Sequence, residues 1–129
     1  MQIKLTSIMV TDQEKALKFY TEVLGFQKKT EIPLGKFKWL TVVSPEAPDG
    51  VELVLEPTEF PPAKPFKKAL FEAGIPSASF NVKDIQEEYE RLTKLGVYFK
   101  SGPSSMGPVI VAVLDDTCGN LLQLTQMAK

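Results

Sequence analysis

The sequence predicts an α+β fold of two βαβββ modules whose sheets pair into one curled mixed sheet, with helices outside and a concave cleft inside. A strand-like run, an acidic N-cap, an amphipathic helix and a glycine occur twice along the chain, and strand-like runs follow each time. Each module is too small to bury its helix and sheet alone, so the two should pack together. The 129 residues fit one domain, residues 1–129.

The first module covers about residues 1–58. Its first strand, at 3–10, has apolar residues on both faces, so both faces should be covered. Asp12 is the expected N-cap of a helix that ends at Gly25. Apolar residues recur at helical spacing between them: Ala16, Leu17, Phe19, Tyr20, Val23 and Leu24. Strand-like runs follow at 26–32, 37–43 and 51–56.

The second module, about residues 75–129, follows a connector at 59–74 with a short helical run of its own. It begins with a strand at 77–82, and Asp84 is the next N-cap, with Glu87 completing a capping box. Ile85, Tyr89, Leu92 and Leu95 form the apolar stripe of this helix, which Gly96 ends. Strands are expected at 97–100, 109–114 and 120–126, and the stretch 101–108 is a candidate lid. Residues 10–26 align with 82–97 with one residue of slack, which indicates an internal repeat.

Composition excludes several functions. Fifteen basic and sixteen acidic residues give a net charge of −1, so no broad positive field attracts nucleic acid or a membrane surface. No apolar run is long enough for a membrane span, and the N-terminal residues do not resemble a secretion signal, which predicts a cytoplasmic protein. The single cysteine, Cys118, cannot form an internal disulfide and is expected to be buried or to line a turn. The absence of histidine excludes Ser-His-Asp and Cys-His catalysis and histidine metal triads.

Three segments together resemble a known family. Residues 10–26 (VTDQEKALKFYTEVLGF) resemble the opening signature of vicinal oxygen chelate proteins, the superfamily of glyoxalases, bleomycin resistance proteins and extradiol dioxygenases. The DDTCGN turn at 115–120 resembles their late turn before the last strand, and Val51-Glu52-Leu53 resembles the strand that ends their first half. The resemblance spans essentially the whole chain and implies the glyoxalase/bleomycin-resistance fold.

In the metal-dependent members, each half offers metal ligands from its first and last strands. The resemblance places Leu5, Glu52, Ser77 and Gln123 at these positions. Leucine cannot coordinate a metal and serine is a poor neutral ligand, so fewer protein donors remain than a tight divalent site requires. We therefore expect no resident cofactor and no metal-binding residues. A weakly bound Mg²⁺ or Ca²⁺, held by Glu52, Gln123 and water, is the remaining metal hypothesis.

Strand alternation predicts which side chains line the cleft. Val51, Leu53 and Leu55 should pack under the helices, and the opposite parity should line the cleft: Glu52, Val54, Glu56, Ser77, Ser79, Asn81, Leu121, Gln123 and Thr125. Buried polar groups without partners are costly, so this polarity favours a wet, ligand-binding cleft. The alternative is that these groups satisfy one another, Glu52 with Gln123 and the serines with backbone.

The predicted ligand-binding residues are Leu5, Trp39, Glu52, Ser77, Ser79 and Gln123. Glu52 is also the one candidate catalytic residue, as a general base on a central strand. A glutamate inherited from a metal-binding ancestor is the alternative. Trp39 is a stacking wall for a planar ligand if its strand face is concave, and otherwise belongs to the core or a dimer contact.

Binding of a small organic molecule in the cleft, without a tightly held metal, is the predicted function. The resemblance implies a homodimer, as in bleomycin-resistance-like proteins. The alternative is a metal-dependent lyase, isomerase or dioxygenase of the same superfamily that uses Glu52. A third class is a non-catalytic interaction domain whose cleft has collapsed.

Overall fold

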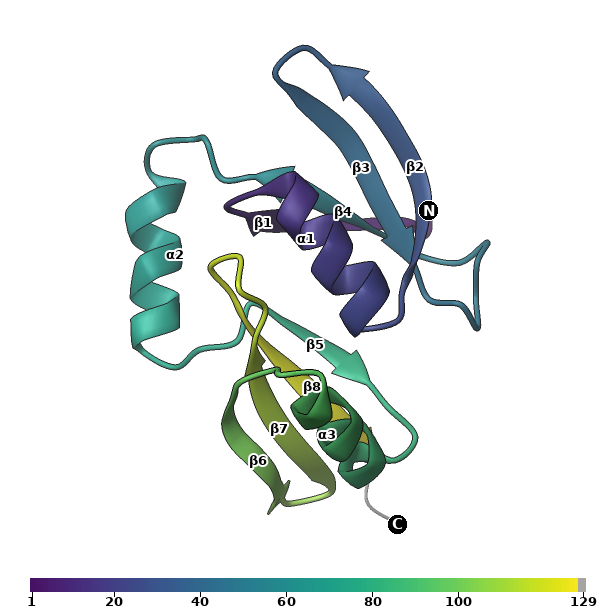
Figure 1. Cartoon of the computed structure of the whole chain (residues 1–129), viewed down its shortest axis with the longest axis vertical. Coiled ribbons are helices and arrows are strands. Elements are labelled where there is room, and N and C mark those ends of the chain that lie inside the picture. The colour runs from purple at the N-terminus through teal and green to yellow at the C-terminus, as the bar shows by residue number, and fades with distance from the viewer. Residues whose placement is uncertain (128–129) are drawn as a thin grey trace. The chain divides into compact units, whose positions relative to one another are not determined.

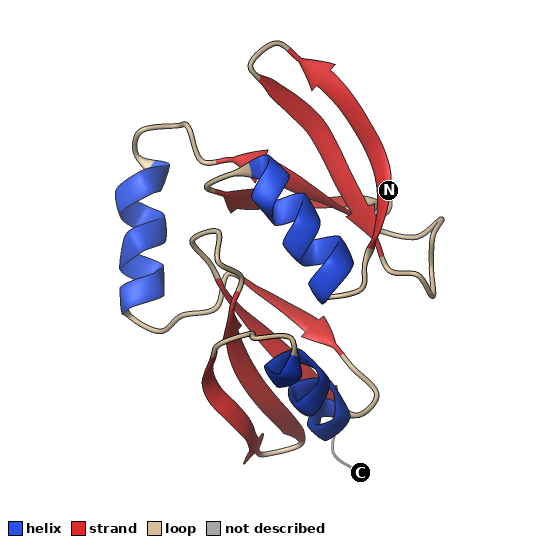
Figure 2. Ribbon diagram, in the orientation of Figure 1, coloured by secondary structure: helices blue, strands red, loops and turns tan. Residues whose placement is uncertain are grey.

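The computed structural model describes residues 1–127, which form eight strands, three α-helices and one π-helical turn. The chain divides into two compact units, residues 1–64 and 65–129 (Figure 1). Each unit is one four-stranded mixed sheet with a helix on one face, as Figure 2 shows. The predicted α+β fold is confirmed.

The first unit contains β1 (Leu5–Val10), α1 (Gln13–Lys18), the π-helical turn η1 (Phe19–Val23), β2 (Gln27–Leu34), β3 (Phe37–Val43) and β4 (Glu52–Pro57). Its strand order is β1-β4-β3-β2. Strand β1 runs parallel to β4, and the other neighbours are antiparallel. Helix α2 (Ala63–Glu72) follows and spans the boundary between the units.

The first helix begins and ends where the sequence predicts. The Asp12 side chain accepts a hydrogen bond of 3.0 Å from the backbone N–H of Lys15, and Gly25 has a φ of +94° after the last turn. Its inner face buries Ala16, Phe19 and Tyr20 against one face of the sheet. The sheet contributes these buried residues: Ile8, Val10, Leu40, Val42 and Leu55.

The second unit repeats this topology. It contains β5 (Ala78–Asn81), α3 (Ile85–Lys94), β6 (Phe99–Met106), β7 (Val109–Asp115) and β8 (Leu121–Met127), in the order β5-β8-β7-β6. Asp84 accepts from the backbone N–H of Glu87 at 3.0 Å, the same cap as in the first unit. The shared topology and the shared caps support the internal repeat.

The predictions for the segment 101–108 and for Val51 are wrong. The candidate lid at 101–108 is mostly strand β6, which continues to Met106. Pro103 is tolerated there because β6 is an edge strand, and the pairing with β7 shifts register on either side of Ser101. Val51 precedes β4 and is 47% exposed, so it does not pack under a helix.

Two apolar residues are more exposed than their patterns predict. Leu5 is 51% exposed, so the first strand is not covered on both faces at this end. Leu95 is 55% exposed because it is the C-cap of α3, where the helical stripe has already left the sheet. Both errors fall at the ends of elements, where periodicity carries the least information.

Among residues 1–127, no helix combines the length and apolar character that crossing a membrane requires.

Candidate functional site

One face of the β1–β4 sheet lies opposite α1 and collects the first set of predicted residues. Leu5 is the cross-strand partner of Glu52, and Thr41 is the partner of Val54. Trp39 lies two residues from Thr41 on β3 and therefore shares this face with Glu52. We call it the β1–β4 open face because α1 does not cover it, although Thr41, Val43 and Val54 on it are buried. It comprises Leu5, Ser7, Met9, Thr30, Ile32, Leu34, Phe37, Trp39, Thr41, Val43, Glu52, Val54 and Glu56.

Glu52 is oriented by a buried hydroxyl. The Thr41 hydroxyl donates to Oε1 of Glu52 at 2.8 Å, and Thr41 is fully buried. The pairing of Glu52 with Gln123, which lies in the other unit, stays a prediction. A fixed donor on one carboxylate oxygen holds the side chain in one orientation.

Glu56 and Thr58 lie on the same side of the chain as Glu52. The backbone N–H of Glu52 donates to Lys4, and that of Thr58 donates to Val10, so Thr58 is in phase with Glu52 and Glu56. Thr58 is 8% exposed, and its Oγ1 has no hydrogen-bond partner within residues 1–127. A buried hydroxyl without a partner is uncommon in proteins, and it marks polar capacity at this end of the face.

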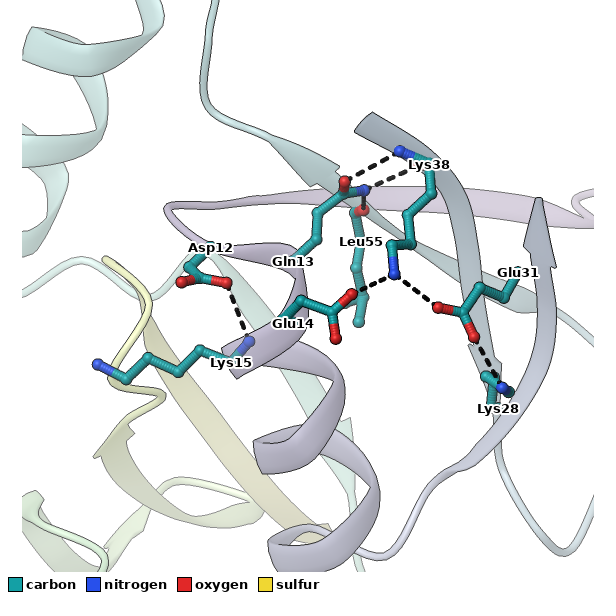
Figure 3. A network of polar contacts seen from close by, with 8 residues as sticks. All are labelled: Asp12, Gln13, Glu14, Lys15, Lys28, Glu31, Lys38 and Leu55. Atoms are coloured by element: carbon teal, nitrogen blue, oxygen red, sulfur yellow. Dashed lines mark hydrogen bonds and ion pairs between the residues drawn. The ribbon is translucent and has the colours of Figure 1, made fainter. Parts of the chain in front are cut away.

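Strands β3 and β4 pair only at Thr41–Val43 and separate on the N-terminal side of Thr41. The side chain of Gln13 bridges the two strands where they separate (Figure 3). Gln13 Nε2 donates to the carbonyl oxygens of Lys38 and Leu55, each at 2.8 Å. Its Oε1 accepts from the Lys38 N–H at 3.1 Å. The amide thus replaces ladder hydrogen bonds where the two strands fork, and it keeps Lys38 and Leu55 close together. Trp39 and Glu56, the next residue on each strand, consequently flank the fork on the open face.

A charged network stands on the helix side of the same strands (Figure 3). Lys38 forms ion pairs with Glu14 of α1 and, at 2.7 Å, with Glu31 of β2; Lys28 lies 2.8 Å from Glu31. Hydrogen bonds from Lys28 and Lys38 lower the pKa of Glu31 to about 2. Hydrogen bonds to Glu14 and Glu31 raise the pKa of Lys38 above its ordinary value. These contacts tie the β2–β3 hairpin to α1.

The second unit has an open face of different chemistry. Ser79 is the cross-strand partner of Gln123, and the Gln123 amide donates to the Ser79 hydroxyl at 3.2 Å. Ser77 donates its backbone N–H to Leu121, which is 2% exposed. The β5–β8 open face comprises Ser77, Ser79, Asn81, Ser101, Ser104, Met106, Val109, Val111, Val113, Asp115, Leu121, Gln123, Thr125 and Met127. Its central polar groups are hydroxyls and amides.

The turn before β8 is held by a buried carboxylate. Asp116 Oδ1 accepts from the backbone N–H groups of Cys118 at 2.7 Å and Asn120 at 3.0 Å, and Oδ2 accepts from the Asn120 side chain at 2.8 Å. Cys118 is fully buried, as expected. The negative charge of Asp116 also acts on Lys67, whose pKa is lowered by burial and raised in part by this charge. The hydrogen bonds give this turn a structural role.

Glu52 and Gln123 do not occupy equivalent positions in the two units. Ser7 and Ser79 each lie five residues before an N-cap aspartate, and their cross-strand partners are Val54 and Gln123. Glu52 instead corresponds to Leu121. Within residues 1–127, no three His, Cys, Asp or Glu side chains gather closely enough to hold a metal ion.

A surface groove of about 850 Å³ lies elsewhere in the first unit. It is lined on the helix side by α1, η1 and the start of β2. Its lining residues are Glu14, Lys15, Leu17, Lys18, Thr21, Glu22, Phe26, Gln27 and Lys28. None of the predicted site residues belongs to it.

Sequence reasoning missed three polar side chains of the first unit. Gln13 stood in the sequence as a polar residue directly after the N-cap, where the second module has buried Ile85, and that mismatch was a usable signal. Thr41 was recognisable only as a neighbour of Trp39 on one strand face. Nothing in the sequence pointed to Thr58.

The chain is similar to known proteins over nearly its whole length. A family model described as "Glyoxalase/Bleomycin resistance protein/Dioxygenase superfamily" matches residues 2–124. The uncharacterized protein YurT of Bacillus subtilis is 56% identical over 126 residues, which cover 98% of this chain and 99% of YurT. The crystal structure of UcmS2 has a TM-score of 0.83 and 30% identity, covering 97% of each chain. The crystal structure of TnmS3, an antibiotic binding protein from Streptomyces sp. CB03234, has a TM-score of 0.79 and 28% identity, covering 99% of this chain and 97% of TnmS3.

Proposed function

Because this chain belongs to the glyoxalase/bleomycin resistance protein/dioxygenase superfamily, we propose that it binds a small organic molecule on the open faces of its sheets. The observation that carries the proposal is the composition of the β1–β4 open face. An aromatic side chain, Trp39, shares that face with a carboxylate, Glu52, which a buried hydroxyl orients. Apolar walls with a few fixed polar groups are typical of small-molecule sites. TnmS3, which is described as antibiotic binding, supports the same class of ligand.

The β5–β8 open face supports the proposal with neutral hydrogen-bonding groups. Ser79 and Gln123 pair with each other, and each retains further donor or acceptor capacity. A face built only to pack would carry aliphatic side chains at these positions. We expect Ser77, Ser79 and Gln123 to form hydrogen bonds with the ligand.

The donor set does not fit the metal site of the superfamily. Leu5 has no donor atom, Ser77 offers a neutral hydroxyl, and Gln123 offers only its neutral amide oxygen, since its Nε2 donates to Ser79. Glu52 alone is a strong ligand, and its Oε1 is engaged with Thr41. We therefore propose that binding requires no tightly held metal and no other cofactor.

The assembly and location belong to the same proposal. Leu5, Ile32 and Leu34 are between 49% and 61% exposed on one sheet face, which favours association with a second copy. We propose a cytoplasmic homodimer that has neither nucleic acid nor a membrane as its partner, in line with the net charge of −1 and the single buried cysteine.

Thermal unfolding of chelator-treated protein tests this function. The protein is heated alone, with Mn²⁺, Ni²⁺, Zn²⁺, Fe²⁺, Mg²⁺ or Ca²⁺, and with a panel of organic compounds that includes glycopeptide antibiotics and glutathione adducts. Compounds that bind the native state raise the midpoint by mass action. We expect a rise with an organic compound and none with a metal.

The rival function is a metal-dependent lyase, isomerase or dioxygenase that uses Glu52. It predicts a large midpoint rise with a divalent ion that disappears in Glu52→Ala. That result would replace the binding function by the enzymatic one. A collapsed interaction domain predicts no rise with any addition.

A further inference from the structure

The outer part of the β2–β3 hairpin has little apolar attachment to the rest of its unit. Beyond the fork, β3 has no pairing with β4 in the described chain, and residues 32–39 pair with each other, from Ile32 with Trp39 to Leu34 with Phe37. We call residues 32–39 the strap. None of them is buried, whereas the next residue, Leu40, is fully buried. Core packing therefore ends at Leu40, and the strap belongs to the part of the unit with low local stability.

Polar contacts tie the strap to α1 and to the connector (Figure 3). The Gln13 amide accepts from the Lys38 N–H at 3.1 Å and donates to the Lys38 carbonyl at 2.8 Å. The Lys38 ammonium forms an ion pair with Glu14, and the Lys36 ammonium lies 4.0 Å from a carboxylate oxygen of Glu59. Ion pairs that face solvent contribute little to stability, so these contacts hold the strap more weakly than a strand ladder would.

The strap cannot instead pair with β4. The register of Thr41 with Val54, extended by three residues, places Lys38 opposite Pro57. The Lys38 carbonyl points toward β4, where Gln13 binds it, and Pro57 has no N–H to offer it. The sequence thus blocks the ladder at this pair. In the second unit, by contrast, β7 pairs with β8 along its whole length, so the equivalent hairpin is fixed to its sheet.

We propose that the strap opens and closes as one piece about a hinge at Leu40, with Gln13 and the Lys38–Glu14 ion pair as its latch to α1. Opening widens the gap between Trp39 and Glu56, so the latch controls the shape of the β1–β4 open face. The motion is a property of the chain alone. Its test therefore needs no ligand, and its failure would leave the proposed function untouched.

Amide hydrogen exchange, followed by NMR on the full chain, tests the strap. The Lys38 N–H is bound by Gln13 and exchanges when the latch releases, whereas strand alternation turns the Trp39 N–H toward β2 inside the strap. We expect Lys38 to exchange at least about tenfold faster than Trp39 and than Val42, which pairs with β4, after correction for intrinsic rates. Equal rates at Lys38 and Trp39 would mean that the strap frays, and equal rates at Lys38 and Val42 would mean that it stays closed. Either result overturns the proposal.

The ion pair separates strap opening from a rotation of the Gln13 side chain alone, which would not depend on the Lys38 ammonium. Glu14→Gln removes the ion pair with α1 and should speed Lys38 exchange about threefold, and added salt should do the same to the unmodified chain. The control Glu88→Gln removes an ion pair with Arg91 on α3 and should leave Lys38 exchange unchanged. An unchanged Lys38 rate in Glu14→Gln would assign the exchange to Gln13 rotation and overturn the proposal.

Discussion

The two units have the same topology but differ in how far their third and fourth strands pair. In the second unit β7 and β8 pair continuously from Val109 with Met127 to Asp115 with Leu121. In the first unit β3 and β4 pair only from Thr41 to Val43, and the β2–β3 hairpin then leaves the sheet. The residue after the N-cap also differs between the units. It is buried Ile85 in the second unit, whereas in the first it is Gln13, whose amide bonds both separating strands.

In the second unit the bonding amide comes from a strand and binds the start of the helix. There the Gln126 side chain of β8 accepts from the backbone N–H of Ile85 at 2.7 Å. One unit thus sends an amide from the helix to the strands, and the other sends one from a strand to the helix. The β5–β8 open face has a continuous β7–β8 ladder and carries hydroxyls and amides among apolar residues, whereas in the first unit Trp39 and Glu56 flank a gap. The difference between the two faces thus coincides with the different residue that follows each N-cap.

The largest expected effect is the loss of the amide at the fork. Gln13→Leu leaves the Lys38 N–H and the carbonyls of Lys38 and Leu55 without this partner in a region where Gln13 is 8% exposed. We expect the free energy of unfolding to fall by about 3 kcal/mol, because each buried polar group left unpaired costs about 1–3 kcal/mol. Urea unfolding measures the change.

The matched control for that experiment lies on α3. Gln86 is exposed and its amide bonds Glu90 at 3.1 Å, so Gln86→Leu should change stability by less than about 0.5 kcal/mol. Equal losses in the two variants would show that the fork does not depend on Gln13.

A smaller effect should distinguish the polar centres of the two open faces. Thr41→Val removes the donor to the half-buried carboxylate of Glu52, which should lower the free energy of unfolding by about 1.5 kcal/mol. The second unit offers Thr125→Val as a comparison, because that hydroxyl makes only a long contact of 3.4 Å with the Phe80 carbonyl. A change within about 0.5 kcal/mol is expected there. If Thr41→Val is as mild, the orientation of Glu52 does not depend on the hydroxyl.

The smallest effect concerns the charged network that only the first unit has. The pKa of Glu31 falls from 4.5 to about 2 in the folded protein, so the folded state favours the ionised form. Its contribution to stability is fully present above pH 4.5 and disappears as the pH falls toward 2. Glu31→Gln should therefore flatten the pH dependence of stability in this window, and added salt should weaken the effect because the network faces solvent.

The matched carboxylate is Glu88, which pairs with Arg91 within α3 at 2.7 Å. Urea unfolding between pH 2.5 and 5 compares Glu31→Gln, Glu88→Gln and the unmodified chain. A slope that Glu31→Gln leaves unchanged would contradict the assignment of the low pKa to Glu31.

The sequence predicted the repeated topology because caps and glycines mark helix ends and alternation marks strands. Asp12, Asp84 and Gly25 act locally, so they remain legible without a structure. It could not predict the fork, since that depends on an amide that meets backbone atoms 25 and 42 residues away. Strand β6 was missed for a related reason. A segment rich in glycine, proline and serine resembles a loop, and edge pairing with β7 overrides that preference.

The candidate site was predicted in part. Alternation alone placed Glu52 opposite the helix, and register then added Trp39 to the same face. The hydrogen-bond partners of Glu52 and Gln123 depend on cross-strand register, which one strand's sequence does not encode. They are Thr41 and Ser79, one in each unit.

The most direct test of the account maps a bound organic compound by amide and methyl NMR shifts. Binding on the open faces predicts shifts concentrated at Trp39, Thr41, Val54, Ser79 and Gln123, with the helix-covered Leu40, Leu55 and Leu122 little affected. Shifts confined to Leu17, Thr21 and Phe26, which line the groove beside α1, would contradict it and move the site to the other side of the sheet.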